Sequence, residues 1–248
     1  GQPEFNCMLC VNLPVPMEYH GRMNRIWHLL RTTIGRKLIV ALTGIVLILF
    51  VVVHISGNLT IYIGQSALNN YAHFLQSSPM LWIMRLAILA IVILHIALGV
   101  AVARENRLAR QKTRHAGESW CLRLYQHRMI ISGLVLLVFI AGHVIHLTLG
   151  VGVSEVFRLK DTSGYVDVYS RVVTAFQNAW IAWAYIAAML FLAIHLKHTV
   201  RAVFQTLGFS RENYFAFFEF LSWLVTLAVV GGFISIPLSV QLGWLAVP

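Results

Sequence analysis

The sequence predicts an all-α membrane protein in which five transmembrane helices form one bundle, and three observations lead to this class. Hydrophobic residues make up 58% of the 248 residues and charged residues only 11%, whereas soluble domains carry about 25% charged residues. The apolar residues gather into five stretches, each about long enough to cross a bilayer. Four of these stretches contain a histidine. The composition excludes a soluble globular domain, a disordered chain and a nucleic-acid-binding protein, despite a net charge of +10.

The five stretches divide the chain into an N-terminal extension (residues 1–34), a transmembrane domain (35–240) and a C-terminal tail (241–248). Fifteen Lys and Arg residues belong to the side of the membrane that carries the N-terminal extension, and four belong to the opposite side. Cytoplasmic loops carry an excess of these residues, so we expect the N-terminus in the cytoplasm and the C-terminus outside. The expected spans are residues 36–60, 80–103, 128–150, 177–200 and 213–238.

The N-terminal extension contains three prolines and reads as irregular. An isolated segment of this kind is not expected to order by itself, so we expect it to lie on a partner subunit. Within it, Cys7 and Cys10 have CxxC spacing. No second cysteine pair completes a four-ligand zinc site.

Four histidines lie inside the first four spans, one in each, and their depths divide them into two layers. At the helical rise, His54 lies about 27 Å from Arg36 and His143 lies about 22 Å from the basic start of its span. His95 and His195 lie about 13 and 9 Å from the next basic residue along the chain. We therefore expect His95 and His195 nearer the cytoplasm, and His54 and His143 nearer the outside.

This pattern indicates haem rather than zinc. One histidine on an apolar helix is more often a hydrogen-bonded packing residue than a ligand, but one on each of four consecutive helices is a different observation. Two histidines from two helices at one depth are what bis-imidazole haem ligation requires, so two layers predict two b haems. Zinc prefers three or four ligands at one depth. His146 and His198, each three residues after a predicted ligand, are the alternatives to His143 and His195.

Several other polar residues are candidates for binding the haem edges or a quinone. Arg36, Lys197 and Arg201 could bind haem propionates, although each taken alone is better explained as a cation that anchors its span at the cytoplasmic interface. Arg85 is an isolated cation on the outer side and a candidate for the outer haem or a quinone. His73, in the outer loop, could exchange protons at a quinone site or be a solvated loop residue. Small residues that would allow a flat macrocycle, or simply helix packing, are Gly44, Gly57, Gly99, Gly133 and Gly142.

The acidic residues argue against other membrane functions. All nine lie in tails, loops or at the ends of spans, whereas proton pumps and ion-coupled transporters bury acids within the membrane. No GxGxxG or phosphate-binding loop is present. Electron transfer is the function that remains.

The sequence resembles the diheme cytochrome b membrane-anchor subunits of the succinate:quinone oxidoreductase family, which comprises succinate dehydrogenases and fumarate reductases. The resemblance covers residues 33–213. It rests on motifs that occur in the family's order: Ile34-Gly35-Arg36-Lys37, Leu42-Thr43-Gly44, His54, Gly57-Asn58-Leu59, Tyr71-Ala72-His73-Phe74-Leu75, His95-Ile96-Ala97-Leu98-Gly99, Ser132-Gly133, His143, His146-Leu147-Thr148, Asp167-Val168-Tyr169, Phe176-Gln177, His195-Leu196-Lys197-His198 and Gln205-Thr206-Leu207-Gly208.

The resemblance implies five transmembrane helices in a bacterial cytoplasmic membrane and two b haems, with His54, His95, His143 and His195 as iron ligands. It also implies a flavoprotein subunit and an iron–sulfur subunit on the cytoplasmic face, menaquinone as the electron partner, and no succinate chemistry on this chain. It leaves open a higher oligomer of the complex. It does not distinguish succinate oxidation from fumarate reduction.

The sequence departs from the family after the fourth-span histidines, where Thr199-Val200-Arg201-Ala202 replaces a glycine followed by a Trp-Ser pair. This difference puts the family's propionate contacts in doubt. Two other functions stay open. One is a quinol-oxidising cytochrome b of a nitrate reductase or hydrogenase complex, which places histidines in pairs on two helices. The other is a haem-free structural anchor.

Overall fold

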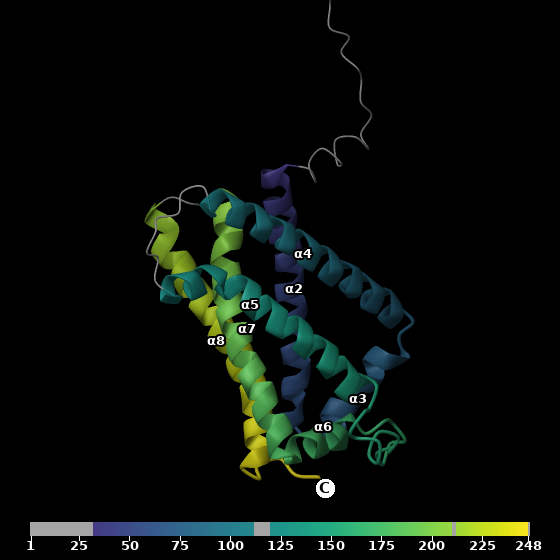
Figure 1. Cartoon of the computed structure of the whole chain (residues 1–248). Helices are drawn as coiled ribbons and strands as arrows, with labels where there is room; N and C mark the ends of the chain where they lie inside the picture. The colour runs from purple at the N-terminus through teal and green to yellow at the C-terminus, as the bar shows by residue number, and fades with distance from the viewer. Residues whose placement is uncertain (1–31, 112–119, 210–211, 248) are drawn as a thin grey trace, which may run out of the picture.

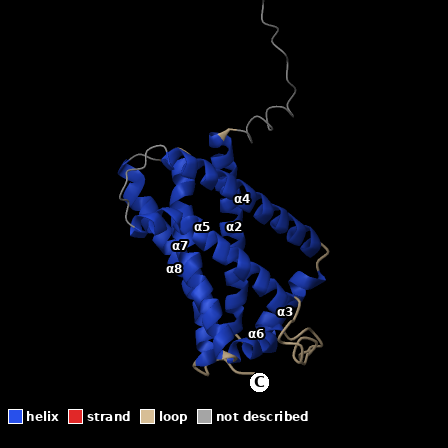
Figure 2. Ribbon diagram, in the orientation of Figure 1, coloured by secondary structure: helices blue, strands red, loops and turns tan. Residues whose placement is uncertain are grey.

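The computed structural model describes residues 32–111, 120–209 and 212–247, and this part of the chain consists of helices joined by turns and loops (Figure 2). Two short helices, α3 (Gln65–Ser77) and α6 (Val168–Gln177), accompany five long ones. A 3₁₀ turn follows the first long helix and a π-helical turn (Val144–Thr148) follows the third. The long helices are α2 (Thr33–Asn58), α4 (Met80–Gln111), α5 (Trp120–His143), α7 (Ala179–Thr206) and α8 (Glu212–Gln241).

The prediction of an all-α membrane protein with five membrane-spanning helices is confirmed. Each long helix lies in a segment that is long and apolar enough to cross a membrane. Three helices extend well beyond their predicted spans, because α4 reaches Gln111, α7 reaches Thr206 and α5 begins at Trp120. Only the part within hydrocarbon must be apolar, and the Arg residues in these extensions are good helix formers. The five segments are Thr33–Tyr62, Met80–Ala109, His127–Thr148, Ala179–Thr206 and Tyr214–Gln241.

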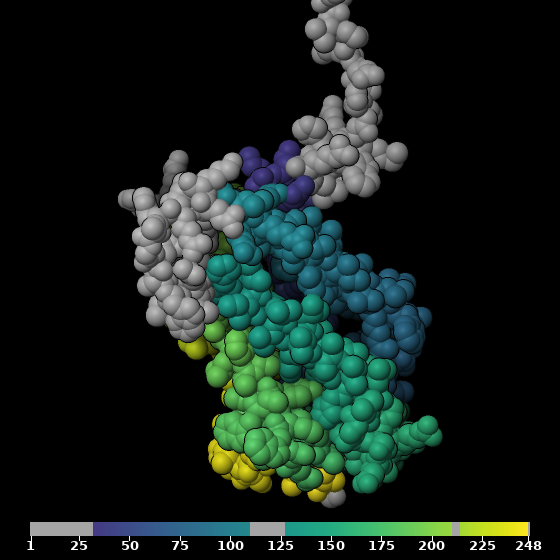
Figure 3. Space-filling view, viewed as in Figure 1, coloured from purple at the N-terminus to yellow at the C-terminus, as the bar shows by residue number. Residues whose placement is uncertain are grey.

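The long helices pack in the order α4, α2, α7, α5, with α8 against both α7 and α2. In Figure 1, α4 and α5 run obliquely across the nearly upright α2, α7 and α8. No residue in the most apolar part of α4 is buried, and α4 packs mainly along α2. The space-filling view is hollowed between α4 and α5 (Figure 3). We call the end of the bundle with Arg36, Arg128 and Arg201 the basic end, and the end with α3 and α6 the far end.

The connections at the far end are helical, whereas the sequence led us to expect loops. His73, expected in a loop, lies in α3. Both α3 and α6 are amphipathic and pack against each other beneath the bundle (Figure 1). Their buried faces join the largest apolar cluster of the described residues, with Ile61, Leu68 and Val173 at 1%, 4% and 0% exposure. Tertiary burial, rather than helix propensity, is what stabilises short helices of this kind.

A buried polar junction ties α3 to α6 at Asp167, the N-cap residue of α6, which is 5% exposed. Its carboxylate accepts hydrogen bonds from the amides of Gln65 (2.7 Å) and Asn69 (3.1 Å) and from the hydroxyl of Ser170 (2.6 Å). Burial alone would raise the pKa of Asp167, but the hydrogen bonds from Ser170, Asn69 and Gln65 outweigh burial and hold its pKa below the ordinary value.

We expect Asp167→Ala to destabilise the far end by about 1–3 kcal/mol, because it removes the cap of α6 and leaves buried donors without an acceptor. A carboxylate with a depressed pKa stabilises the fold above its unfolded pKa of about 3.9, and this contribution is lost as the pH falls through the folded value. The melting temperatures of wild type and variant in detergent should therefore differ at neutral pH, and the difference should shrink as the pH falls below about 4 towards the folded pKa of Asp167. An equal difference at both pH values would show that the charge of Asp167 contributes nothing.

Gly57 on α2 is a point of close approach between α2 and α3. A Cβ at Gly57 would overlap the ring of Tyr71 on α3. We expect Gly57→Ala to lower stability by about 1–3 kcal/mol, as overpacking typically does. Gly231→Ala on α8 is the matched control, because no atom lies within 4 Å of the added Cβ and alanine favours a helix over glycine by about 1 kcal/mol. Melting temperatures that shift in the same direction would contradict the prediction.

Most of the N-terminal extension, including Cys7 and Cys10, lies outside the described residues, so its contact with a partner stays a prediction. At the other end of the chain, the segment after α8 packs back on the bundle. Leu245 is 9% exposed, and the hydroxyl of Tyr169 donates to the carbonyl of Ala246 (3.2 Å).

Candidate functional site

Each of the four helices that form the packing series α4, α2, α7 and α5 carries one of the four predicted ligands. His54 lies on α2, His95 on α4, His143 at the end of α5 and His195 on α7. All four side chains are partly buried. The structure brings them together as two pairs, one towards the far end and one towards the basic end.

The far-end pair consists of His54 and His143, whose ring centroids lie 6.1 Å apart with the ring planes at 83°. Phe50 stacks on His54, Phe233 packs against His54, and Phe139 packs against His143. Nδ1 of His143 is buried and has no hydrogen-bond partner. The two imidazoles therefore lie next to each other in surroundings that are mainly aromatic.

The spacing of the far-end pair suits a shared metal ion. Metal–imidazole bonds of about 2 Å on opposite sides of one ion place the two ring centres about 6 Å apart. The residues thus fit bis-imidazole ligation of a haem iron. One contact competes with it, because the amide of Asn58 lies 3.3 Å from Nε2 of His54 and also donates to the His54 carbonyl (2.9 Å).

The basic-end pair consists of His95 and His195, and each ring is held by a hydroxyl from the neighbouring helix. Nδ1 of His95 lies 2.9 Å from Oγ1 of Thr43 on α2, and Nδ1 of His195 lies 3.2 Å from Oγ of Ser132 on α5. The glycine that follows each hydroxyl residue lies against the edge of the same ring. A Cβ added at Gly44 would lie 3.6 Å from Cε1 of His95, and a Cβ added at Gly133 would lie 3.5 Å from Cε1 of His195. No described residue forms a hydrogen bond to Nε2 of either ring.

Thr43 and Gly44 place the His95 ring beside α7, within about one turn of the level of His195. Besides His95, Gly44 contacts Thr199, one helical turn from His195 on α7. Along α2, Thr43 precedes His54 by eleven residues, or about 16 Å. The two pairs therefore occupy separate levels of the bundle.

The predicted propionate ligands are paired with carboxylates. Arg36 forms an ion pair with Glu105 on α4. Lys197 and Arg201 both pair with Glu219 on α8, at 3.1 and 3.5 Å. Lys197 follows His195 by only two residues, so the two side chains leave opposite sides of α7. Lys197 and Arg201 thus face α8, whereas His195 faces α5. Of the three cations, Arg36 is the one aligned with the basic-end pair, because it lies on the same face of α2 as Thr43, two turns away.

The two candidates for a quinone site are exposed near the far end. Arg85 lies in the second turn of α4, with its guanidinium 5.0 Å from the ring centroid of Trp82. His73 stacks on Tyr165, with ring centroids 3.8 Å apart. Neither His73 nor Arg85 forms a hydrogen bond or ring contact with the far-end pair within the described chain.

The alternative ligands have partners of their own. Nδ1 of His146 lies 3.0 Å from the hydroxyl of Tyr185 on α7, and its Nε2 is buried without a hydrogen bond. Nδ1 of His198 lies 3.3 Å from Nη2 of Arg128.

Sequence reasoning missed the contacts of Thr43, Ser132 and Tyr185 with histidine rings. A signal for the first two exists, because a hydroxyl residue, a glycine and, ten residues later, a histidine occur on both α2 and α5. Tyr185 carries no comparable signal.

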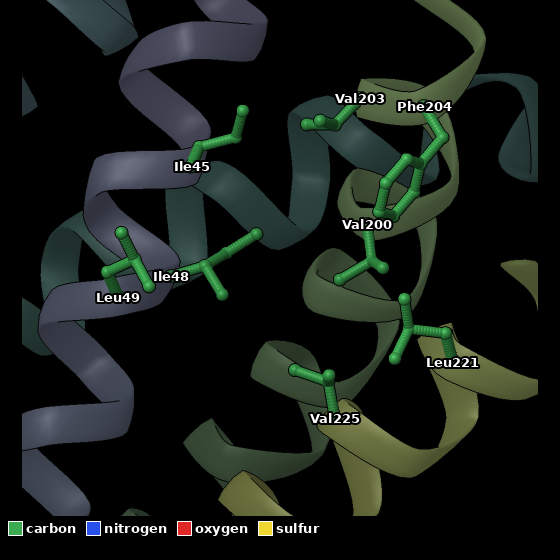
Figure 4. Close-up of a pocket in the computed structure, with 8 residues that line it drawn as sticks. All are labelled: Ile45, Ile48, Leu49, Val200, Val203, Phe204, Leu221 and Val225. Atoms are coloured by element: carbon green, nitrogen blue, oxygen red, sulfur yellow. The ribbon is translucent and has the colours of Figure 1, made fainter. Parts of the chain in front are cut away.

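A separate pocket of about 170 Å³ lies on another face of α7, between α2 and α8 (Figure 4). All its lining side chains are apolar, so nothing in it could orient a polar ligand, and we leave it out of the candidate site. The lining residues are Ile45, Ile48, Leu49, Val200, Val203, Phe204, Leu221 and Val225.

Comparisons of the chain with models of protein families, with curated proteins and with solved structures find no match.

Proposed function

We propose that the chain is a diheme cytochrome b membrane-anchor subunit of a succinate:quinone oxidoreductase. It carries electrons between flavoprotein and iron–sulfur subunits on the cytoplasmic side and menaquinone in a bacterial cytoplasmic membrane. The observation that carries the proposal is the arrangement of four histidines on four helices as two pairs at separate depths. The far-end pair, with ring centroids 6.1 Å apart, supports it most directly. The family resemblance of residues 33–213 supports the choice of complex.

In this function, His54 and His143 hold one haem b, and His95 and His195 hold the other. A bis-imidazole haem supplies one-electron exchange at its iron, with a potential set by ligands, hydrogen bonds and burial. The chain's own residues hold the four rings in place. The aromatic side chains of Phe50, Phe139 and Phe233 surround the far-end pair and limit access of water.

The ends of the bundle would meet different partners. The basic end suits the iron–sulfur and flavoprotein subunits, because it is the end that the charge distribution predicts to be cytoplasmic. At the far end, His73 and Arg85 remain the candidates for quinone contact, and both are exposed. Arg36 remains the best candidate to bind a propionate of the haem at the basic-end pair. It could do so either in place of its ion pair with Glu105 or while keeping that ion pair.

The proposal is tested on the complex purified from membranes through an affinity tag on this chain. Haem quantification should give two b haems per chain, and a reduced-minus-oxidised spectrum should show both. The same preparation should contain a flavin-bearing subunit and oxidise succinate with a quinone as acceptor.

Each other result identifies a different function. Absence of haem from the intact complex would indicate a structural anchor. Two haems without a flavoprotein or succinate oxidation would indicate the cytochrome b of another respiratory complex. A hydrogenase or nitrate reductase partner in the preparation would identify that complex directly.

A further inference from the structure

The same dipeptide pattern occurs on two helices of the bundle. Thr43-Gly44 on α2 and Ser132-Gly133 on α5 each place a hydroxyl eleven residues before a histidine of the far-end pair. Each hydroxyl contacts a histidine of the basic-end pair on the next helix in the packing order, at 2.9 Å and 3.2 Å. Each glycine lies against the edge of that ring, where an added Cβ would make an ordinary van der Waals contact. The basic-end pair is thus held by one local arrangement used twice.

The direction of these hydrogen bonds follows from counting protons. A hydroxyl has a single hydrogen to donate. The hydroxyl of Thr43 donates to the carbonyl of Ile39 (2.8 Å), and the hydroxyl of Ser132 donates to the carbonyl of Met129 (3.2 Å). While each hydroxyl keeps its bond to the backbone carbonyl, its oxygen can only accept from the ring, and this arrangement requires the proton on Nδ1. A neutral imidazole protonated at Nδ1 carries its lone pair on Nε2.

We infer that Thr43 and Ser132 are positioning residues, which hold His95 and His195 in the Nδ1–H tautomer so that both rings present Nε2 as a metal ligand. The inference rests on the proposed function only for the identity of the metal group. A hydrogen bond from the far nitrogen of a ligating imidazole orients the ring and makes it a more basic ligand. A more basic ligand favours the ferric over the ferrous ion, so the two hydroxyls would lower the potential of a haem bound at this pair.

The far-end pair lacks this arrangement. Nδ1 of His143 is buried without a partner, and the polar neighbour of His54 is the Asn58 amide at Nε2. Removing the hydroxyls of Thr43 and Ser132 should therefore affect one haem only.

The variants are Thr43→Val, Ser132→Ala and the double variant, each in the intact complex. Thr43→Ser restores the hydroxyl and separates its loss from any effect of altered shape. Thr199→Val is the matched control, because this hydroxyl donates to the His195 carbonyl (2.8 Å) and touches no ring nitrogen. Valine at this position also keeps the methyl group that lies against Gly44.

The main measurement is a potentiometric titration followed at both haems, with the low-spin ferric electron paramagnetic resonance signals as a second readout. Thr43→Val and Ser132→Ala should raise the midpoint of the same haem. If the ligands favour ferric over ferrous iron ten times less strongly, the midpoint potential of this one-electron couple rises by about 59 mV. The double variant should shift further, while Thr43→Ser and Thr199→Val should match wild type. Unchanged midpoints in both single variants, or shifts at two different haems, would overturn the inference.

A measurement without haem keeps this result separate from the proposed function. Nitrogen-15 solid-state magnetic resonance of the histidine-labelled, haem-free chain in lipid distinguishes the two tautomers of neutral imidazole. His95 and His195 should be Nδ1–H in wild type, and each hydroxyl variant should remove the Nδ1–H signal of the ring that the hydroxyl contacts. Protonation at Nε2 in wild type would overturn the inference even if the complex contains two haems. An Nδ1–H result in a complex that contains no haem would leave the positioning role standing and remove the proposed function.

Discussion

Replacement of His95 or His195 by alanine is expected to remove one of the two haems and to leave the other in place. His95 lies on α4 and His195 lies on α7. Between these helices, Gly44 on α2 lies against both the His95 ring and Thr199, which is one turn from His195. Loss of either imidazole leaves the iron at this level with one protein ligand instead of two. Haem quantification should fall to about half, and the surviving spectrum and potential should be the same in both variants, because the far-end pair is untouched in each.

His198→Ala is the matched control for this prediction. His198 lies one turn from His195 on α7, and its Nδ1 lies 3.3 Å from Nη2 of Arg128. We expect the His198→Ala complex to keep both haems. If it loses one while His195→Ala keeps two, the ligand on α7 is His198. If His95→Ala and His195→Ala both retain two haems with normal spectra, the basic-end pair does not bind haem.

The spans could be predicted closely because a bilayer imposes a strong constraint on sequence. Every backbone group in hydrocarbon must be satisfied within the helix, and about 20 apolar residues are needed to cross. The predicted span 80–103 therefore falls inside α4, and 213–238 falls within three residues of Tyr214–Gln241 at each end. The depth of a histidine along such a helix follows from the rise per residue, which is why His54 and His143 could be assigned to one level.

What could not be predicted is the direction in which each side chain points across the bundle. Lys197 and His195 are neighbours in sequence, yet the Lys197 ammonium pairs with Glu219 and lies 3.8 Å from the ring centroid of Trp223 on α8. That contact depends on how α7 is rotated against α8, which the sequence of one helix does not contain. The same holds for Thr43 and Ser132, whose residue types are common in spans and acquire a role only when a second helix packs against them.

The helices at the far end escaped prediction for a different reason. Residues 65–77 contain many polar residues and read as a loop, but Asn69 is fully buried and joins three partners in the fold. Its side-chain amide donates to Asp161 and Asp167, and its carbonyl oxygen accepts from the backbone of Tyr169. A polar residue of this kind resembles a loop residue until the segments that satisfy it are known.

His143→Ala is expected to remove the far-end haem and the quinone activity that depends on it, whereas His146→Ala is expected to keep both haems. The His143 ring lies 6.1 Å from the His54 ring, the spacing that suits a shared iron. Nδ1 of His146 lies 3.0 Å from the hydroxyl of Tyr185. Tyr185 packs against both histidine rings, with centroids 5.9 Å away in each case. The readouts are haem content and quinone reduction by the intact complex.

Tyr185→Phe separates a supporting role of His146 from ligation, because it removes the hydroxyl bonded to His146 and keeps the aromatic packing against His143. We expect this variant to retain both haems, as His146→Ala should. Loss of the far-end haem in His146→Ala but not in His143→Ala would transfer the ligand role to His146, which would require the π-helical turn after α5 to rotate towards His54. Retention of both haems in the two single variants and in the double variant would remove α5 and its π-helical turn from haem ligation, and would leave His54 to find its partner on another helix.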